Sequence, residues 1–324
     1  MKKIPRYISR SISGVLPEKW LLKRQFPVFL PFYHMVSNEK LPYILNYPYR
    51  NEKEFEKELD FYLKHFQAAG LEEVVSPGHT GGKMFHISFD DGLRQCADVV
   101  APLLLRKGIP ATFFINTAFI DNTKLFHRYK ASLILSQLRQ THNQKVNEYL
   151  EKENLAGEKI LQASIYQEEI LNEAARMLEF SFTDFLNRQQ PYMSSEQVKK
   201  LASEGFCIGA HSHTHPEFYE ISAAEQLSEV RESMARVVQL VKPRLKVFSF
   251  PFTDSGVPAT LLKTIQQENL CDFTFGTAGI KKDSVCFHIQ RYPAEQPGDF
   301  IRNLKGEIVY YFMRAWSGKG TVTH

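Results

Sequence analysis

Two short clusters of polar residues could carry chemistry in this sequence. The first is Asp90-Asp91, which ends an apolar run and is followed by Gly92. The second, from His211 to His215, holds three of the 11 histidines of the chain. Imidazole and carboxylate groups are common ligands of zinc and similar metals, and a catalytic zinc takes three protein ligands and leaves one position for water. Together the clusters predict a metal site with one spare carboxylate.

Such a site favours hydrolysis of an amide or an ester. Two imidazoles and one carboxylate would hold the metal, which lowers the pKa of water from about 15.7 to about 7. The second carboxylate would act as general base and take the proton as the water attacks a carbonyl group. Two alternatives stay open: an Asp-Asp-Gly turn that caps the following helix, and a surface loop that is rich in histidine by chance.

The elements around both clusters indicate how they are positioned. Strands are predicted at 26–33, 84–89, 111–115, 206–209, 247–250, 272–275 and 285–289, and helices at 52–66, 94–107, 194–204, 222–240 and 259–268. Repeated strand–helix units predict an α/β fold with a mostly parallel sheet, open or closed into a barrel. Each cluster directly follows a strand, and active sites of parallel barrels lie at the carboxyl ends of the strands.

Two segments depart from this alternation. A polar, helical stretch at about 121–192 predicts an insertion, either a solvated decoration or a lid or partner surface. The first 25 residues are basic, with Ile4, Ile8, Ile12 and Val15 at helical spacing. We favour a helix that lies against the domain, with a membrane-surface anchor as the alternative. The predicted organisation is a basic segment, 1–25, and one domain, 26–324.

The composition limits the class of protein. The chain has 324 residues, of which 43% are hydrophobic and 23% charged, as in soluble globular proteins. A net charge of +4 does not predict nucleic-acid binding. No apolar run approaches the ~20 residues that span a bilayer, and no secretory signal is visible, so we expect a cytoplasmic protein. Four scattered cysteines predict reduced thiols rather than disulfides.

These residues resemble the polysaccharide deacetylases with a NodB-homology domain. Residues 88–92 (SFDDG) are similar to the T-F-D-D-G motif of that family, and residues 209–216 (GAHSHTHP) to its H-[S/T]-x-x-H motif. The resemblance covers about residues 26–300, less the insertion. It implies a distorted (β/α) barrel with about seven parallel strands. It also implies a divalent metal, with zinc as first choice and cobalt, nickel or manganese as alternatives.

The resemblance also implies roles for individual residues. Asp90 would be the general base, and Asp91, His211 and His215 the metal ligands, while His213 falls on a variable position. Residues 248–252 (FSFPF) are similar to a third motif, F-x-Y-P-Y, in which the backbone amide corresponding to Phe252 binds the oxyanion.

Three further residues complete the predicted site. The general acid would be His288, the nearest match to a Leu-x-His motif, unless it is a strand histidine that faces elsewhere. Arg291 would replace an arginine of the third motif by pairing with Asp90, or form an ordinary surface ion pair. We group it with the substrate-binding residues, together with His34, which follows Tyr33 as in related exopolysaccharide enzymes. His86 is expected in the core.

The predicted function is a metal-dependent hydrolase that removes acetyl groups, mainly N-acetyl groups, from a sugar, a glycan or a glycan precursor. A cytoplasmic enzyme would meet a lipid-linked or nucleotide-linked precursor. Two alternatives remain: a barrel that binds carbohydrate with little or no turnover, and a hydrolase of another non-peptide C–N bond. The expected partner is therefore an acetylated carbohydrate and no nucleic acid, and the alternative for the basic N-terminus is weak association with the inner face of the membrane.

Overall fold

The computed structural model describes the chain except residues 1–5, 18–20, 23–26 and 77–82. Its centre is a single parallel sheet of eight strands, joined in the order β10-β8-β7-β6-β5-β4-β1-β11. The strands are β1 (Pro31–Tyr33), β4 (Ile87–Phe89), β5 (Ala111–Ile115), β6 (Cys207–Ala210), β7 (Val247–Ser249), β8 (Phe273–Gly276), β10 (His288–Gln290) and β11 (Tyr292–Pro293).

The two end strands of this sheet are pieces of one extended segment, and this closes the barrel. β10 pairs with β8, whereas β11 pairs with β1 at the other edge, and only Arg291 separates them. The Arg291 N–H donates to Gly276 O on one side, and the Tyr292 N–H donates to Leu30 O on the other. Counted as one strand, residues 288–293 make a seven-stranded, nearly closed barrel, so the predicted distorted (β/α) barrel is confirmed.

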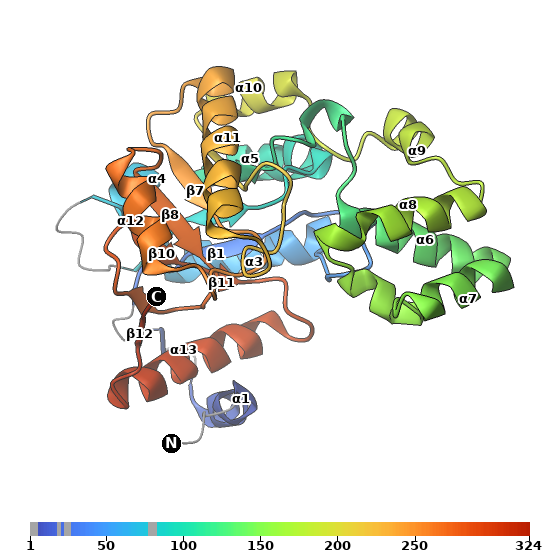
Figure 1. Cartoon of the computed structure of the whole chain (residues 1–324). Coiled ribbons are helices and arrows are strands. Elements are labelled where there is room, and N and C mark those ends of the chain that lie inside the picture. The colour runs from blue at the N-terminus through green and yellow to red at the C-terminus, as the bar shows by residue number, and fades with distance from the viewer. Residues whose placement is uncertain (1–5, 18–20, 23–26, 77–82) are drawn as a thin grey trace.

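Helices surround the barrel (Figure 1). They are α3 (Glu52–His65), α5 (Ala101–Lys107), α10 (Ser195–Ser203), α11 (Ala223–Val241), α12 (Ala259–Gln267) and α13 (Phe300–Trp316), with the short α4 (Leu71–Val74). Capping boxes begin α3 at Asn51, α10 at Ser194 and α11 at Ser222. Such a box satisfies two of the backbone N–H groups that a helix start leaves unpaired, which explains why these helices begin where they do.

Strand residues alternate between the inside of the barrel and the layer under the helices. Phe89 and Phe113 face outward and stack on one another, with ring centroids 5.3 Å apart. Ser88 and Phe114 have the opposite parity and line a narrow space inside the barrel together with Arg291. This parity decides which strand residues can reach the carboxyl-end site.

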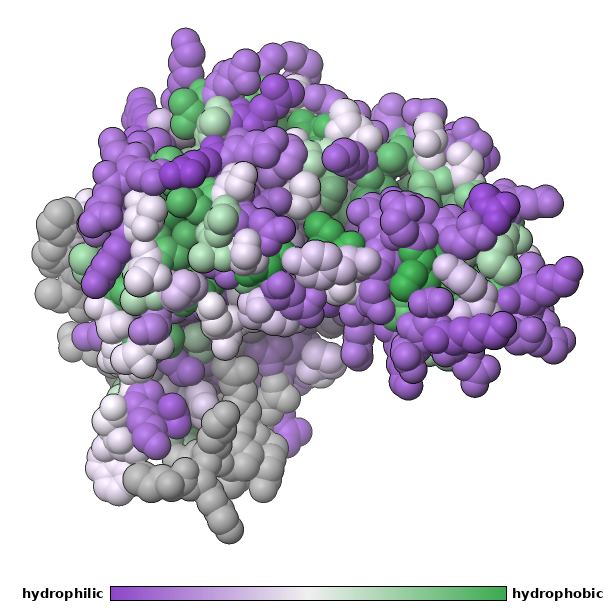
Figure 2. Space-filling model, in the orientation of Figure 1, coloured by the Kyte–Doolittle hydropathy of each residue, from purple (hydrophilic) through white to green (hydrophobic). Residues whose placement is uncertain are grey.

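The stretch between β5 and β6 forms a separate helical lobe (Figure 1). It contains α6 (His127–Thr141), α7 (Gln144–Lys152), α8 (Glu168–Met177) and α9 (Phe182–Gln189). The lobe has its own apolar cluster, which includes Ile134, Leu150 and Leu171. Hydrophilic side chains cover most of its visible face (Figure 2). The solvated surface and internal cluster explain why the sequence there is polar yet helical.

The first helix, α1 (Arg6–Val15), packs against α13. Ser9 and Ser13 are buried, whereas Ile12 is 39% exposed. The helix therefore lies against the domain, with Ser9 and Ser13 on its buried side. The side chains of Ile8 and Val15 lie outside the described part of the structure. Ile4 and the first basic residues lie outside the described part of the chain. Among the described helices, none is long and apolar enough to cross a membrane.

Candidate active site

Three side chains converge at the carboxyl ends of β4 and β6. Asp91 Oδ1 lies 3.6 Å from His211 Nε2 and 3.2 Å from His215 Nε2, and all three residues are buried. Ligands placed about 2.0–2.2 Å from a tetrahedral zinc are about 3.3–3.5 Å apart. The observed separations therefore match a shared metal ion.

The hydrogen bonds around the three residues leave their converging atoms available. His211 Nδ1 donates to Ser249 O at 2.9 Å, which leaves Nε2 with its lone pair. Burial, and then His215 nearby, outweigh the aspartates and lower the pKa of His211 to about 4, so the ring is neutral. Asp91 Oδ1 is buried and has no hydrogen-bond partner among the described residues. A neutral imidazole and an unsatisfied buried carboxylate oxygen are what a divalent cation requires.

Unusual backbone conformations aim these residues at one point. Asp91, Ser212, His215 and Phe252 all have positive φ angles, of 71°, 67°, 59° and 55°. Such angles are costly for residues other than glycine and concentrate at functional sites. Successive residues of a regular strand face opposite sides, so the turn at Asp91 is what brings both aspartates to the same site.

Two tyrosines that the sequence analysis missed hold the other oxygen of Asp91. Tyr47 and Tyr129 donate to Oδ2 from 3.2 and 2.9 Å, and their hydroxyls are 2.6 Å apart. Tyr47 follows β1, and Tyr129 lies in the first turn of α6, which belongs to the helical lobe. Oδ2 is therefore fixed, and Oδ1 is directed at the histidines. The only signal in the sequence was the local density of aromatic residues, at 43–49 and 126–129.

Arg291 binds Asp90 through two parallel hydrogen bonds of 2.8 Å each. Burial raises the pKa of Asp90, but Arg291 and then His211 overcome that effect, and the net pKa lies below the ordinary value. Arg291 is 1% exposed and also donates to the hydroxyls of Ser88 and Ser249. The pair is thus not on the surface. Arg291 lies inside the barrel, beneath Asp90, and does not face the substrate side.

The start of the helical lobe and the third motif enclose His215. The Phe126 and Phe252 rings lie edge-on to the imidazole, with centroids 4.5 and 4.6 Å away. The Arg128 guanidinium lies 4.2 Å from the Phe252 ring and donates to the buried Glu217. In the described residues no acceptor is found for the Phe252 backbone N–H. That N–H is therefore available to an oxyanion.

His34 is the most accessible of the predicted site histidines. Its Nδ1 donates to Glu295 Oε2 at 2.6 Å, and 24% of its side chain is exposed. Its ring stacks on Tyr47, with centroids 4.3 Å apart. Burial lowers the pKa of His34, but Glu295, followed by Asp91 and Asp90, raises it to about 9. His34 is thus held as a cation at the edge of the site, and its partner Glu295 was missed.

His288 is not in a position to act as general acid. It is fully buried, its Nδ1 contacts Thr274 Oγ1 at 2.8 Å, and its Nε2 contacts Asp254 at 3.1 Å. Arg291 points into the barrel, and a residue three positions earlier on the same segment has the opposite parity. His288 therefore faces outward, away from Asp90, and the assignment of the acid to it is corrected.

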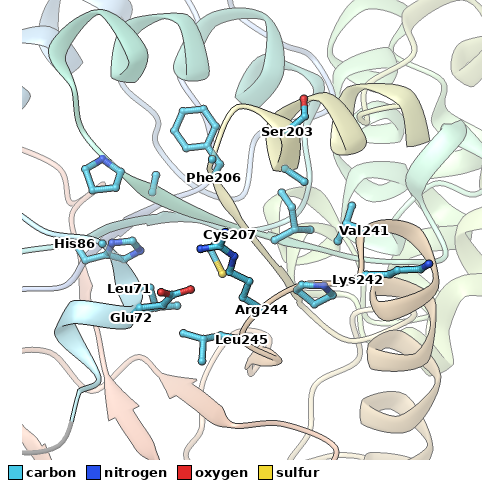
Figure 3. A pocket seen from close by; sticks show the side chains of 17 residues that line it. Leu71, Glu72, His86, Ser203, Phe206, Cys207, Val241, Lys242, Arg244 and Leu245 are labelled. Atoms are coloured by element: carbon cyan, nitrogen blue, oxygen red, sulfur yellow. The ribbon is translucent and has the colours of Figure 1, made fainter.

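Two other histidines also lie apart from the converging ligands. His213 contacts Thr117 Oγ1 and Glu232 Oε1, at 2.9 and 3.2 Å. His86 is buried between Ala69 O and Thr112 Oγ1, and burial lowers its pKa to about 4. It also lines a cavity of about 560 Å³ with Glu72 and Arg244 (Figure 3). That cavity opens at the amino ends of the strands, opposite to Asp90 and Asp91.

Comparisons with known proteins agree with this geometry. The chain resembles the solved structures of the deacetylase PplD from Streptococcus pyogenes in complex with acetate (12% identity, TM-score 0.56, 88% of this chain and 99% of that chain) and of IcaB from Ammonifex degensii (14%, 0.57, 87% and 98%). It also resembles a de-N-acetylase from Aggregatibacter actinomycetemcomitans (12%, 0.51, 86% and 99%). At these identities the likeness shows the fold. No curated protein sequence matches the chain significantly.

The family assignment rests on the sequence. The family model described as polysaccharide deacetylase matches residues 78–161 and 166–270, which together exceed half of the chain and contain both motif clusters. The chain therefore belongs to the polysaccharide deacetylase family, whose activity is deacetylation of carbohydrates.

Proposed function

We propose that this protein is a metal-dependent hydrolase that removes an N-acetyl group from a sugar or glycan precursor. The observation that carries the proposal is the convergence of Asp91, His211 and His215 beside an Asp90 that Arg291 keeps ionised. Three protein ligands leave a position for water, as in catalytic sites, whereas a structural site is closed by a fourth. Zinc is the first choice, because two imidazoles and one carboxylate suit it.

Asp90 has the ionisation state and the position that a general base requires. When bound, a divalent metal supplies electrophilic activation, since such ions lower the pKa of water to about 7. Asp90 lies 3.9 Å from His211 Nε2, next to the ligand atoms, and its lowered pKa keeps it ionised at neutral pH. It can therefore accept the proton of the attacking water. Arg291 fixes its orientation and lowers its basicity.

His34 is the best-placed proton donor for the leaving amine. It is a cation near neutral pH, its side chain is partly exposed at the edge of the site, and Glu295 orients its ring. The Phe252 N–H is the donor that would stabilise the developing oxyanion. Tyr47 and Tyr129 keep Asp91 in its ligating orientation. The acid and base are thus separate groups whose environments place their pKa values on opposite sides of neutrality.

The test is acetate release by the purified full chain, stripped of metal with a chelator and reloaded with zinc or cobalt. N-acetylglucosamine oligomers and nucleotide-linked or lipid-linked N-acetyl sugars serve as substrates. Removal of a general base costs about 10²–10⁴-fold in rate. We expect a loss of this size for Asp90→Asn and the loss of metal-dependent activity for His211→Ala.

Asp98→Asn is the matched control, because Asp98 is 51% exposed and lies on the helix that follows the first motif. It should retain full activity. Unchanged acetate release by Asp90→Asn and His211→Ala would refute the mechanism. Stoichiometric metal binding without acetate release on any substrate would instead indicate a binding barrel.

A further inference from the structure

A second group of potential ligands lies away from Asp91. Asp254, Asp283, His288 and His324 each offer one ligand atom, and these four atoms lie within 4.8 Å of one another. Their side chains are 0–4% exposed. Asp254 follows β7, Asp283 ends β9 (Lys282–Asp283), His288 begins β10, and His324 follows β12 (Thr321–Val322).

Two of the separations between the ligand atoms fit a metal site. His288 Nε2 lies 3.1 Å from Asp254 Oδ2, and His324 Nε2 lies 3.2 Å from Asp283 Oδ2. The imidazole centroids are 4.9 Å apart, with the rings nearly perpendicular at 80°. The two nitrogen–oxygen distances are close to the separation of about 3.3–3.5 Å that two ligands of one tetrahedral zinc have.

Neutral groups hold both oxygens of each carboxylate in place. Asp254 Oδ1 accepts the Thr277 N–H at 3.0 Å, and Asp283 Oδ1 accepts the Val285 N–H at 2.9 Å. Gln290 Nε2 donates to Oδ2 of both aspartates, at 2.6 and 2.8 Å. Metal-ligating residues are typically held by such outer hydrogen bonds. Each carboxylate is therefore oriented, and one oxygen of each is directed at an imidazole.

The orientation of His324 is that of a metal ligand. His324 Nδ1 lies 3.2 Å from Val257 O, and a carbonyl oxygen only accepts, so Nδ1 carries the proton. Its Nε2 lone pair then faces a carboxylate oxygen, an arrangement that requires a proton or a cation between the two atoms. His211 has the same arrangement in the active site, with Nδ1 donating to a backbone carbonyl. Two buried carboxylates also need compensating positive charge, which a divalent cation supplies in full.

A close approach of backbone makes room for the cluster. A Cβ atom on Gly276 would collide with the carboxylate of Asp254 and the amide of Gln290. Asp254 and His324 also line a surface cavity of about 570 Å³, through which an ion could enter. Lys281, Arg314 and Lys319 line the same cavity and disfavour loosely held cations. An ion retained there would have to be held by direct ligation.

We propose that Asp254, Asp283, His288 and His324 bind a second, structural divalent metal ion of the zinc type. With four protein ligands the site is closed, unlike the three-ligand active site, so it would not activate water. It joins the loop that carries Phe252 to the strand that carries Arg291, and ties the segment after β12 to both. This site does not depend on the deacetylase chemistry.

The experiment counts metal ions bound to the full chain. Metal-free protein is titrated with Co²⁺, whose visible absorption reports tetrahedral sites, and zinc content is measured after dialysis. We expect two equivalents for the unmodified chain and one for His211→Ala/His215→Ala, which lacks the active-site histidines. We expect loss of the other equivalent in Asp283→Asn/His324→Ala, and no change in Asp60→Asn, an exposed aspartate on α3.

The variant without active-site histidines decides the proposal even if Asp283→Asn/His324→Ala does not fold. One retained equivalent, together with a zinc-dependent rise in its thermal midpoint, supports the second site. If that folded variant binds no Co²⁺ or Zn²⁺, the proposal is overturned, and the cluster is a hydrogen-bonded network with a protonated His324.

Discussion

Replacement of Glu295 by glutamine tests whether His34 is the proton donor. The Glu295 carboxylate accepts from His34 Nδ1 at 2.6 Å and from the Met35 N–H at 3.3 Å. Glutamine has nearly the same shape, and its single amide oxygen can keep the short bond from His34 Nδ1, whereas the longer bond from the Met35 N–H to the other oxygen is lost. Glu295→Gln therefore removes the charge that favours the imidazolium while it preserves the position of the ring.

The size of the expected change in the pKa of His34 follows from the groups around it. Burial lowers its pKa, and the nearby carboxylates, Glu295 first, raise it from 6.5 to about 9. A bound divalent cation offsets Asp90 and Asp91, so Glu295 becomes the main remaining cause. An opposite charge in contact shifts a pKa by about 1–3 units. We expect the basic limb of the pH profile of kcat/KM to move down by about that amount, with a tenfold loss of rate per unit above it.

The stability that Glu295→Gln loses should depend on pH in a defined direction. A group whose pKa is raised on folding stabilises the protein fully below its unfolded pKa, and loses that contribution as the pH rises through the folded value. For His34 these limits are 6.5 and about 9. The thermal midpoint of Glu295→Gln should therefore fall most below pH 6.5, and the deficit should narrow towards about pH 9.

The assay is kcat/KM for acetate release from about pH 5.5 to about pH 10, with thermal unfolding over the same range. Glu56→Gln is the control, since Glu56 is 46% exposed and pairs with Lys107 on the surface. If Glu295→Gln loses stability at low pH but the basic limb of its kcat/KM profile does not move, the His34–Glu295 pair is structural, and His34 is not the general acid.

Three further outcomes follow from the structure. Arg291→Met should lower the free energy of unfolding by about 3–5 kcal/mol in urea titrations, because it leaves Asp90 buried without its partner. Asp90→Asn in the same chain should restore part of that loss, and no recovery would contradict the pairing argument. Tyr129→Phe should weaken zinc binding by about 10–100-fold in isothermal titration, whereas Tyr166→Phe, 63% exposed on the lobe, should not. We also propose a cytoplasmic location, which recovery of the protein from the periplasm in cell fractionation would contradict.

The local motifs made the metal half of the site predictable. Asp91, His211 and His215 each follow a strand, and parallel strands bring their carboxyl ends to one edge of a sheet. The positive φ angles at Asp91 and His215 could not be read from the sequence, since neither residue is glycine. Those angles determine which of the two adjacent aspartates turns toward the histidines.

Strand parity explains the error at His288. Arg291 and His288 were both placed in the site, yet residues three apart on an extended segment face opposite sides. Because Arg291 pairs with the buried Asp90, its side chain faces the inside of the barrel, and His288 therefore faces outward. A sequence argument that pairs Arg291 with Asp90 and also respects strand parity therefore excludes His288 from the site.

The acid half of the site depends on long-range contacts that no pattern reveals. His34 and Glu295 are 261 positions apart and meet only because β1 and β11 are adjacent in the closed barrel. Closure depends in turn on the change of partner strand at Arg291. The residue that orients the base is therefore also the point at which the barrel closes and brings the acid pair together.

The helical lobe contributes to the candidate active site, which its polar sequence concealed. Its first turn supplies Tyr129, which holds Asp91, and directly before it Phe126 packs on His215. Both contacts act on metal ligands rather than on substrate, so a displacement of α6 would alter metal affinity before it altered substrate binding. Of the other helices, α9 also reaches the residues around the site, because Phe185 and Leu186 belong to the same apolar cluster as Tyr43 and Tyr129. The helices α7 and α8 pack around a separate apolar cluster. The lobe is therefore neither a detachable decoration nor a simple lid, because one end of it forms a wall of the metal site.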